Sequence, residues 1–288
     1  MSLTGLFSIG VSGVTAFTTS LEAVSNNIAN SQTVGFKRAR TDFADLVTAG
    51  AQQPGGRGGA GVGAVNRQLI AEQGAVTRTQ TKTNAAISGD GFFVVSETAN
   101  GNGGVAPYLF TRAGDFAPNA AGDLVNGAHY FLQGYALNAD GGANGARGLS
   151  GLETVNINRR PPLPDGAADP GALLGVEIAA DGRLMASYAN GETYALYRIP
   201  VALFTNSGGL DEASATAFLN ATDAGSIQIV NPGESRSGIL ETAAVEISTV
   251  DIGSEFSTLI ATQRAYASNA KIISVADELW RKLVETAA

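Results

Sequence analysis

Residues 254–283 read SEFSTLIATQRAYASNAKIISVADELWRKL, and this stretch decides the fold. Mostly large side chains recur alternately four and three residues apart, which is the heptad spacing of a helix that packs along another helix. With its neighbours on both sides, the stripe consists of Ile252, Phe256, Leu259, Gln263, Tyr266, Ala270, Ile273, Asp277, Trp280 and Val284. The spacing predicts a long C-terminal helix with one seam, which Gln263 and Asp277 interrupt as polar breaks.

The other end of the chain has the same spacing. Its stripe consists of Leu3, Phe7, Gly10, Val14, Phe17, Leu21, Val24 and Ile28. An isolated amphipathic helix gains most of its stability from packing, so we expect the terminal helices to pair with each other, with neighbouring copies, or with both. Interior glycines cost a helix about 1 kcal/mol each relative to alanine, so the N-terminal helix should order on assembly. The alternative is a pair of ordinary core helices in a globular domain.

The N-terminal helix is followed by residues 31–64, which end in the glycine-rich run AQQPGGRGGAGVGA. So much glycine predicts no regular element, and we interpret residues 31–64 as a linker arm. A phosphate-binding loop is disfavoured because no Gly-Lys-Ser/Thr follows the run.

Short apolar and β-branched runs alternate with turn pairs over residues 65–249, which predicts a body of hairpins. The turn pairs are Asn100-Gly101, Asn126-Gly127, Asp140-Gly141, Asp181-Gly182 and Asn190-Gly191. In the segment VEIAADGRLMASYANGETYALY (176–197), two of these pairs separate three runs, which predicts a meander. Residues 159–170 contain several prolines, which lack a backbone donor, so this segment should form an irregular crossover on the surface.

The predicted fold class is α+β, with long terminal helices pairing as a coiled-coil-like domain, a linker arm and a mainly antiparallel β body. Residues 1–30 with 250–288 form the helical assembly domain, and residues 65–145 with 172–249 form the body. Residues 146–171 are predicted to be a short insertion in that body.

Composition excludes several classes of partner. The formal charge is −8 and the pI is near 4.7, so a nucleic acid or an anionic membrane would be repelled on average. Cysteine is absent, which removes disulfides and thiolate metal sites.

Residues 2–21 carry no charge, but no Lys or Arg precedes them and polar residues interrupt them. We expect neither a cleaved signal peptide nor membrane insertion, and any export should use a signal-independent route.

An enzyme is disfavoured by what the sequence lacks. His129 is the only histidine, and its neighbours Tyr130 and Phe131 indicate a strand residue. No nucleophile elbow accompanies it, and the carboxylate pairs Asp211-Glu212 and Asp277-Glu278 are typical of solvated positions. We predict no catalytic residue, no metal site and no cofactor. A hydrolase using His129 or a carboxylate pair is the remaining enzymatic alternative.

Three blocks of sequence resemble the axial proteins of the bacterial flagellum, which form its rod, hook and hook-associated junctions. They are SNNIANSQTVGFKRARTDFADL (25–46), ISGDGFFVV (87–95) with FTRAGDFAPNAAGDLVN (110–126), and the C-terminal stretch quoted first. Residues 175–204 and 206–210, with ADGRL and SYANGET, are most similar to hook proteins. The resemblance implies a subunit of the flagellar hook that polymerises into a tubular flexible joint and transmits torque from the basal body to the filament.

The resemblance also implies partners and a location. We expect a homopolymer that meets distal-rod proteins, hook-associated junction proteins, the hook cap and the flagellar export apparatus, outside the cell. Hook proteins usually carry a large outer domain, in whose place residues 146–171 stand here. The alternatives are a distal-rod subunit and, in another class, a secreted adhesin or binding module.

The resemblance places an assembly interface on the terminal blocks. Asn26, Asn27 and Asn30 are expected to bond across a helix contact, with Asn30 able to end the helix in a left-handed conformation. Gly35 should supply a turn and Phe36 an anchor. The predicted interface is Leu3, Phe7, Val14, Phe17, Leu21, Val24, Asn26, Asn27, Ile28, Asn30, Gly35, Phe36, Phe256, Leu259, Gln263, Arg264, Tyr266, Asn269, Ile273 and Trp280. The alternatives to an assembly role are that the three asparagines simply mark the end of a helix, that Arg264 is solvated, and that Tyr266 is an ordinary core residue.

Overall fold

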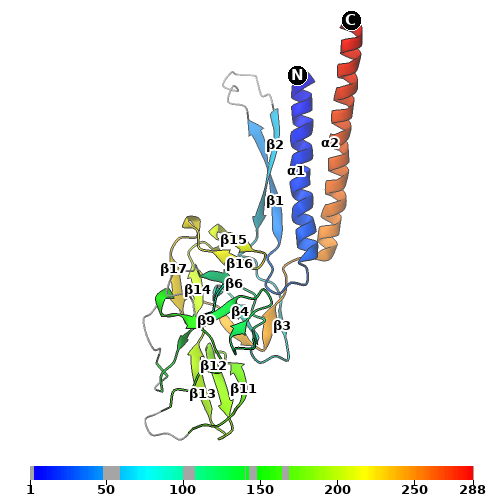
Figure 1. Cartoon of the computed structure of the whole chain (residues 1–288). Helices are drawn as coiled ribbons and strands as arrows, with labels where there is room; N and C mark the ends of the chain where they lie inside the picture. Colours follow the sequence, from blue (N-terminus) through cyan, green and yellow to red (C-terminus); the bar gives the residue numbers. More distant parts are fainter. Residues whose placement is uncertain are drawn as a thin grey trace. The chain divides into compact units, whose positions relative to one another are not determined.

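The computed structural model describes residues 3–47, 59–99, 108–139, 141–142, 148–163 and 169–287. A long helix lies at each end of the chain, α1 (Leu3–Ala29) and α2 (Ile252–Ala287) (Figure 1). The residues between them in the sequence form mainly antiparallel strands. The predicted α+β fold class is therefore confirmed. The chain divides into two compact units. We call Met1–Ser31, Arg38–Leu69 and Val250–Ala288 the helical unit, and Gln32–Lys37 with Ile70–Thr249 the body.

In the helical unit, α1 and α2 lie side by side and antiparallel, and a hairpin lies along α1 (Figure 1). The hairpin consists of β1 (Ala39–Val47) and β2 (Gly59–Gln68). The prediction of no regular element in the glycine-rich run was wrong for its end, where β2 begins, and β1 also lies within residues 31–64, which the sequence predicted to be a linker arm. Residues 48–58 lie outside the described part. Glycine has a packing role in β2, because a Cβ on Gly61 would lie 2.1 Å from Ser12 Oγ of α1. Ser12 Oγ also accepts a 3.2 Å hydrogen bond from the Val62 N–H.

Small side chains form the contact between the two helices. The buried positions of α1 are Gly10, Gly13, Ala16, Ser20, Ala23, Val24 and Asn27. A Cβ on Gly10 would lie 2.9 Å from Ile273 Cγ1, and one on Gly13 would lie 2.4 Å from Asn269 Oδ1. The buried positions of α2 are Glu255, Thr262 and Ala276. The predicted seam was therefore misplaced on α2 by about one residue, because the close approach of the helices selects small side chains rather than large apolar ones.

The body is built from short strands. They are β3 (Val76–Arg78), β4 (Ala85–Ser88), β5 (Phe92–Ser96), β6 (Leu109–Thr111), β7 (Ala117–Pro118), β8 (Leu124–Val125), β9 (Phe131–Ala136), β10 (Glu153–Thr154), β11 (Leu173–Ile178), β12 (Arg183–Tyr188), β13 (Thr193–Arg198), β14 (Val201–Phe204), β15 (Asp211–Ser214), β16 (Ala217–Leu219), β17 (Ile227–Val230), β18 (Ile239–Thr242) and β19 (Ala244–Glu246). The main sheet has the order β11-β12-β13-β9-β5-β6-β16-β15. Beside it, β18 pairs with β4 and β19 pairs with β3.

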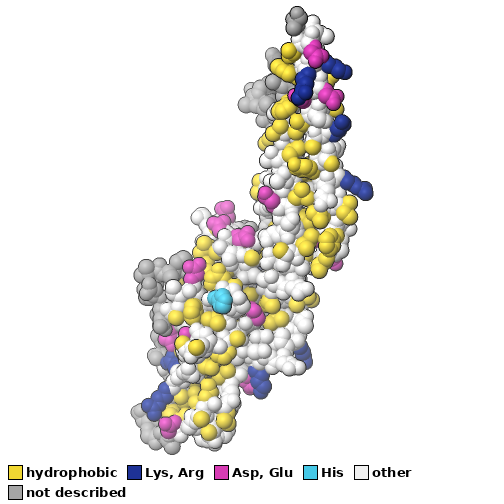
Figure 2. All heavy atoms as spheres, turned by 45° about the vertical axis from the view of Figure 1, so that its right-hand side comes forward, with side chains coloured by type: hydrophobic (Ala, Val, Ile, Leu, Met, Phe, Trp, Pro, Cys, Tyr) yellow, Lys and Arg dark blue, Asp and Glu magenta, His cyan; other side chains and the backbone are white. Residues whose placement is uncertain are grey.

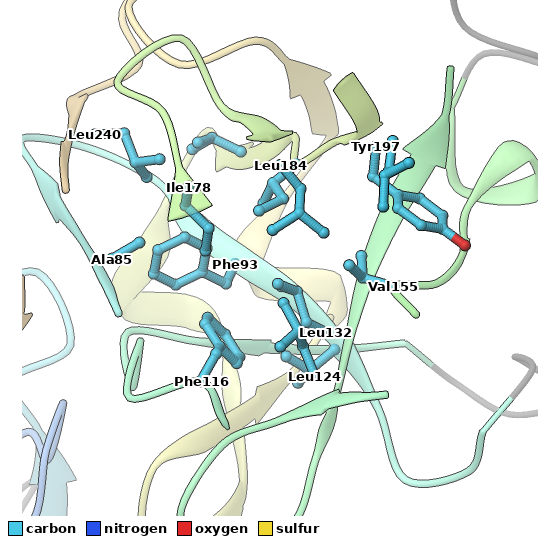
Figure 3. Close-up of a cluster of buried hydrophobic side chains, with 14 of the residues drawn as sticks. Ala85, Phe93, Phe116, Leu124, Leu132, Val155, Ile178, Leu184, Tyr197 and Leu240 are labelled. Carbon is cyan, nitrogen blue, oxygen red and sulfur yellow. The ribbon is translucent and has the colours of Figure 1, made fainter. Parts of the chain in front are cut away.

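Both faces of β5 are buried, and they contribute to two separate apolar clusters. Phe93 and Val95 belong to the larger cluster, in which Phe93 meets Phe116 edge to face at a centroid distance of 5.4 Å (Figure 3). Phe92 and Val94 belong to the second cluster. Successive side chains of a strand point to opposite faces, so β5 joins the two clusters of the body.

The predicted meander is confirmed. β11, β12 and β13 pair antiparallel in sequence order. Gly182 and Gly191 take left-handed backbone conformations in the two connecting turns, with φ of 80° and 83°. Asn126-Gly127 likewise lies between the paired strands β8 and β9. The pair Asn100-Gly101 and Asp140 lie outside the described residues.

Two predictions about the body were wrong. His129 is not a strand residue: it lies exposed in the turn before β9 with a left-handed φ of 64°, where the Asn126-Gly127 turn reverses the chain. The described parts of the proline-rich segment contain no regular element, as expected, but Pro161 and Pro170 are buried. That segment therefore contributes to the interior of the body instead of running only over its surface.

Candidate assembly surface

Exposed apolar side chains are concentrated in the helical unit. Of the eighteen large apolar side chains that are exposed in the described residues, fifteen belong to this unit. Ten of them are on α2, namely Ile252, Phe256, Ile260, Tyr266, Ile272, Val275, Leu279, Trp280, Leu283 and Val284. Figure 2 shows hydrophobic side chains along the helices of this unit, with charged side chains toward the end of α2. An extended apolar surface of this kind marks a site of contact with another molecule.

The predicted interface residues on α2 are mostly exposed. Phe256 is 49%, Tyr266 38% and Trp280 53% exposed. Gln263 and Arg264 are also exposed, whereas Leu259, Asn269 and Ile273 are partly buried. Most of the face of α2 that meets α1 is formed by a neighbouring stripe, so Phe256, Tyr266 and Trp280 stay available to a partner. Ile273 is an exception, because it lies against Gly10 of α1.

The predicted residues on α1 lie in different surroundings. Phe7 is exposed, Val24 is buried, and the side chain of Leu3 lies outside the described part. The partly buried members are Val14, Phe17, Leu21 and Ile28. Phe17 packs on Phe43 of β1 with the ring centroids 5.4 Å apart. The hairpin therefore covers part of the α1 surface that the sequence analysis predicted to be the helix-packing seam.

The three asparagines act within their own chain. Asn27 is 1% exposed, and its side chain donates to the Ala39 carbonyl and accepts from the Ala39 N–H, each at 2.8 Å. Asn30 Nδ2 donates to Asn26 Oδ1 at 2.7 Å and to the Asn26 carbonyl at 3.0 Å. α1 does end at Ala29, but Asn30 is not among the residues with positive φ, so the predicted left-handed end was wrong.

Gly35 and Phe36 also differ from the predicted interface. Gly35 does supply a turn, with φ of 70°, and a Cβ there would lie 2.4 Å from the Ala113 nitrogen. Phe36 is fully buried in the body, and its carbonyl accepts a 3.2 Å hydrogen bond from Thr249 N–H. Phe36 thus anchors its own chain and presents no surface to another copy.

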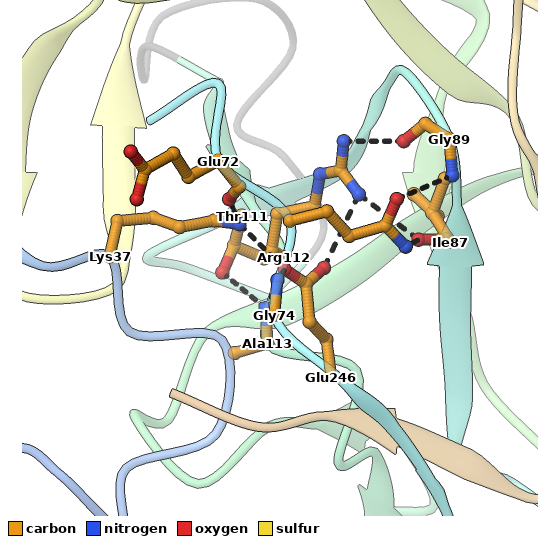
Figure 4. A network of polar contacts seen from close by, with 10 residues as sticks. Lys37, Glu72, Gly74, Ile87, Gly89, Thr111, Arg112, Ala113 and Glu246 are labelled. Carbon is orange, nitrogen blue, oxygen red and sulfur yellow. Dashed lines mark hydrogen bonds and ion pairs between the residues drawn. The ribbon is translucent and has the colours of Figure 1, made fainter. Parts of the chain in front are cut away.

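A buried ionic network in the body was missed by the sequence analysis. Glu246 accepts from Lys37 Nζ at 2.6 Å, from Arg112 Nη1 at 3.3 Å and from the Gly74 N–H at 2.7 Å (Figure 4). Arg112 also donates to the Gly89 carbonyl at 2.7 Å. The only signal in the sequence is that charged residues interrupt apolar strand segments at Arg112 and Glu246.

Burial sets the electrostatics of this network. Loss of hydration lowers the pKa of Lys37 and of Arg112, and the carboxylate of Glu246 acts in the opposite direction on both. Two cations share one carboxylate in a site where Glu246 has no exposed surface. The network therefore holds the Gln32–Lys37 segment to the strands of the body.

Neither a metal site nor a membrane span is found in the described part of the chain. No three His, Cys, Asp or Glu residues there are grouped to hold a metal ion. No helix there combines the length and the apolar character needed to cross a membrane. The fold and the exposed helix faces define a structural protein that offers its terminal helices for contact.

Comparisons with known proteins agree with this class. The family model described as Flagella basal body rod protein matches residues 7–37. The model described as Flagellar hook protein FlgE/F/G D1 domain matches residues 86–186. The model described as Flagellar basal body rod FlgEFG protein C-terminal matches residues 241–286. The three matches fall on the blocks that carry the sequence resemblance.

Individual relatives are similar over nearly the whole chain. The flagellar basal-body rod protein FlgG of Bacillus subtilis is 32% identical over 291 residues, with 96% of each chain covered. The flagellar hook protein FlgE of Brucella suis is 28% identical over 406 residues, with 99% of each covered. A crystal structure of the Helicobacter pylori flagellar hook protein FlgE2 is similar with a TM-score of 0.43 and 10% identity, over 59% of this chain and 100% of that one.

This chain belongs to the family of flagellar rod and hook proteins. It is an axial structural subunit of the flagellum, of its basal body or its hook, and not an enzyme.

Proposed function

We propose that this chain is the hook subunit, which polymerises through its terminal helices into a tubular flexible joint and transmits torque from the basal body to the filament. The observation that carries the choice of hook is the meander β11-β12-β13, whose turns contain the hook-like sequences ADGRL and SYANGET. The exposed apolar face of α2 supports polymerisation, because it is available for contact with another copy. A contact between two different surfaces of identical chains builds an open helical filament when the rotation between copies does not close a ring.

The proposal includes the neighbours of such a polymer. The rod-side end would meet distal-rod proteins, the outer end would meet the hook cap and then the junction proteins, and the flagellar export apparatus would deliver the chain. The alignment with FlgE of Brucella suis spans 406 positions, more than the 288 residues of this chain, so that relative has additional residues. We propose that residues 146–171 stand in place of a large outer domain.

A distal-rod subunit is the second candidate, favoured by length. The alignment with the rod protein FlgG of Bacillus subtilis spans 291 positions, close to the length of this chain. The regular β1–β2 hairpin also occupies the region where a rod-specific insertion would be expected. A flexible joint and a straight rod would make different demands on this hairpin.

Deleting the gene and imaging isolated basal bodies by electron microscopy separates the candidates. Loss of a hook subunit should leave basal bodies with rods but without hooks, and loss of a distal-rod subunit should remove both. The purified chain should form tubes under polymerising conditions. A chain that stays monomeric, together with normal flagella in the deletion strain, would favour an adhesin or binding module.

A further inference from the structure

An open apolar groove of about 320 Å³ lies in the helical unit between α1, β1 and the first half of α2. Phe17 and Phe43 line it from α1 and from β1. The small residues Ala23 and Ala261 line it from the two helices. Phe43 and Ala261 are exposed, so the groove is open to solvent. Its floor includes the ion pair of Arg38 and Glu255 at 2.6 Å.

The end of α2 is apolar, and it extends beyond the described start of α1. α2 has 36 residues and α1 has 27, and Gly10 of α1 lies against Ile273 of α2. Because the helices are antiparallel, α1 starts opposite a position about two turns beyond Ile273. The apolar side chains there form what we call the apolar end of α2, namely Leu279 (47% exposed), Trp280 (53%), Leu283 (60%) and Val284 (53%).

The groove and the apolar end of α2 cannot meet within one chain. Ala261 lines the groove and Trp280 belongs to the apolar end, and both are on the same continuous helix. At a rise of about 1.5 Å per residue they are separated by roughly 28 Å. An occupant from this helix must therefore come from another copy. A contact between two different surfaces repeats from copy to copy, and it builds an open filament when the rotation between copies does not close a ring.

We propose that the apolar end of α2 of one copy binds in the groove of the next copy, with Trp280 against Phe17 and Phe43. This contact rests on the proposed polymerisation and adds which two surfaces meet. The two cations that line the groove are already paired, Arg38 with Glu255 and Arg40 with Asp42. The contact therefore rests on the hydrophobic effect, because it removes the exposed apolar end of α2 and the exposed ring of Phe43 from water together.

Cysteine cross-linking tests the contact directly, because the chain has no cysteine of its own. A variant carrying both Ala261→Cys and Leu283→Cys should form a ladder of disulfide-linked oligomers when its polymers are oxidised, since the bond needs Cβ atoms about 4 Å apart. Copolymers of the two single variants should give dimers only. The matched control combines Ala270→Cys with Leu283→Cys, since Ala270 is exposed on the opposite side of α2 from Ala261 and should give no ladder.

Trp280 is the only tryptophan of the chain and reports on the same contact. Its fluorescence should shift to the blue and resist acrylamide quenching on polymerisation. Filling the groove with Ala261→Phe should raise the critical concentration at least tenfold, whereas Ala270→Phe should not. Tubes that form without the specific ladder and without the blue shift would overturn this contact and leave the hook proposal intact. A parent chain that forms no tubes at all would overturn both.

Discussion

Asn27, near the end of α1, and Ala39, the first residue of β1, are joined by two hydrogen bonds of 2.8 Å, one in each direction. The backbone groups of Ala39 are satisfied by a side chain from a helix, which fixes where the hairpin starts relative to α1 inside the helical unit. The second asparagine of the NNIAN sequence thus has an intramolecular role in the described structure.

Replacing Asn27 should destabilise the helical unit. Asn27→Leu leaves the N–H and the carbonyl of buried Ala39 without their partner, which costs about 1–3 kcal/mol for each group. Asn26→Leu is the matched control, since Asn26 is exposed and its loss should cost less than about 1 kcal/mol. Thermal unfolding followed by circular dichroism measures both. Equal losses for the two variants would contradict the assigned role of Asn27.

The network around Glu246 should be the most sensitive ionic site of the body. Glu246→Gln leaves Lys37 and Arg112 buried without a carboxylate, a change that typically costs about 3–5 kcal/mol. The control is Glu177→Gln in the exposed pair with Lys82, which should cost less than about 1 kcal/mol. Urea unfolding of the two variants gives the comparison, and a Glu246 variant as stable as the control would disprove the ionic role.

Asp115 should destabilise the body at neutral pH. Burial raises its pKa above the usual 3.8, although the Gly127 N–H donates to its Oδ2 at 3.1 Å. As the pH rises from 3.8 to the raised pKa, the unfolded chain loses its proton first, so the contribution of Asp115 to stability falls across that range. Asp115→Asn should therefore be more stable than the parent at pH 7, and the difference should vanish below pH 3.8. Asp211→Asn is the control, because the side chain of Asp211 is exposed and its replacement should change the free energy of unfolding by less than about 0.5 kcal/mol.

Periodicity predicted the terminal helices and the meander, but not the β1–β2 hairpin. Heptad spacing predicted both terminal helices, and the Asx-Gly pairs of residues 176–197 predicted the meander. These signals are local, because they depend on the geometry of a helix or a turn.

Contacts between elements were not predictable in the same way. The helices pack closely at Gly10 and Gly13, but a search for heptads of apolar side chains gives little importance to glycine. Likewise, β2 needs Gly61 in order to approach Ser12, although glycine by itself disfavours a strand. The Lys37–Glu246 pair joins residues far apart in the sequence, so no local pattern predicts it.

The exposed face of α2 should be needed for assembly but not for folding. Phe256 and Ile260 are 49% and 51% exposed, so changing both to Asp should leave the monomer's circular dichroism unchanged and abolish polymerisation, because two charges would be buried at the contact. Leu174→Asp with Ile239→Asp is the matched control, since these apolar residues of the body are 71% and 58% exposed. Sedimentation measures the polymer. Filaments from the α2 variant would exclude this face as the interface.

The proline-rich segment contributes to the stability of the body, although the sequence alone suggests a dispensable surface loop. The guanidinium of Arg159 lies 5.1 Å from the ring centroid of Tyr197, and Pro161 and Pro170 are buried. The Pro170 carbonyl also accepts a 3.2 Å hydrogen bond from the Asn190 N–H in the meander.

Joining Asn158 to Ala172 through a short Gly-Ser linker should therefore destabilise the body. The lost cation–π contact is worth about 0.5–2 kcal/mol, and the buried prolines add to it, so we expect a loss of about 2 kcal/mol and a fall in Tm of about 4–8 °C. Replacing only residues 164–168 by a Gly-Ser stretch of equal length keeps Arg159, Pro161 and Pro170 and should leave the Tm unchanged. Differential scanning calorimetry measures both variants. An unchanged Tm in the shortened chain would mean that loop closure, which depends only weakly on length, is the sole role of this segment.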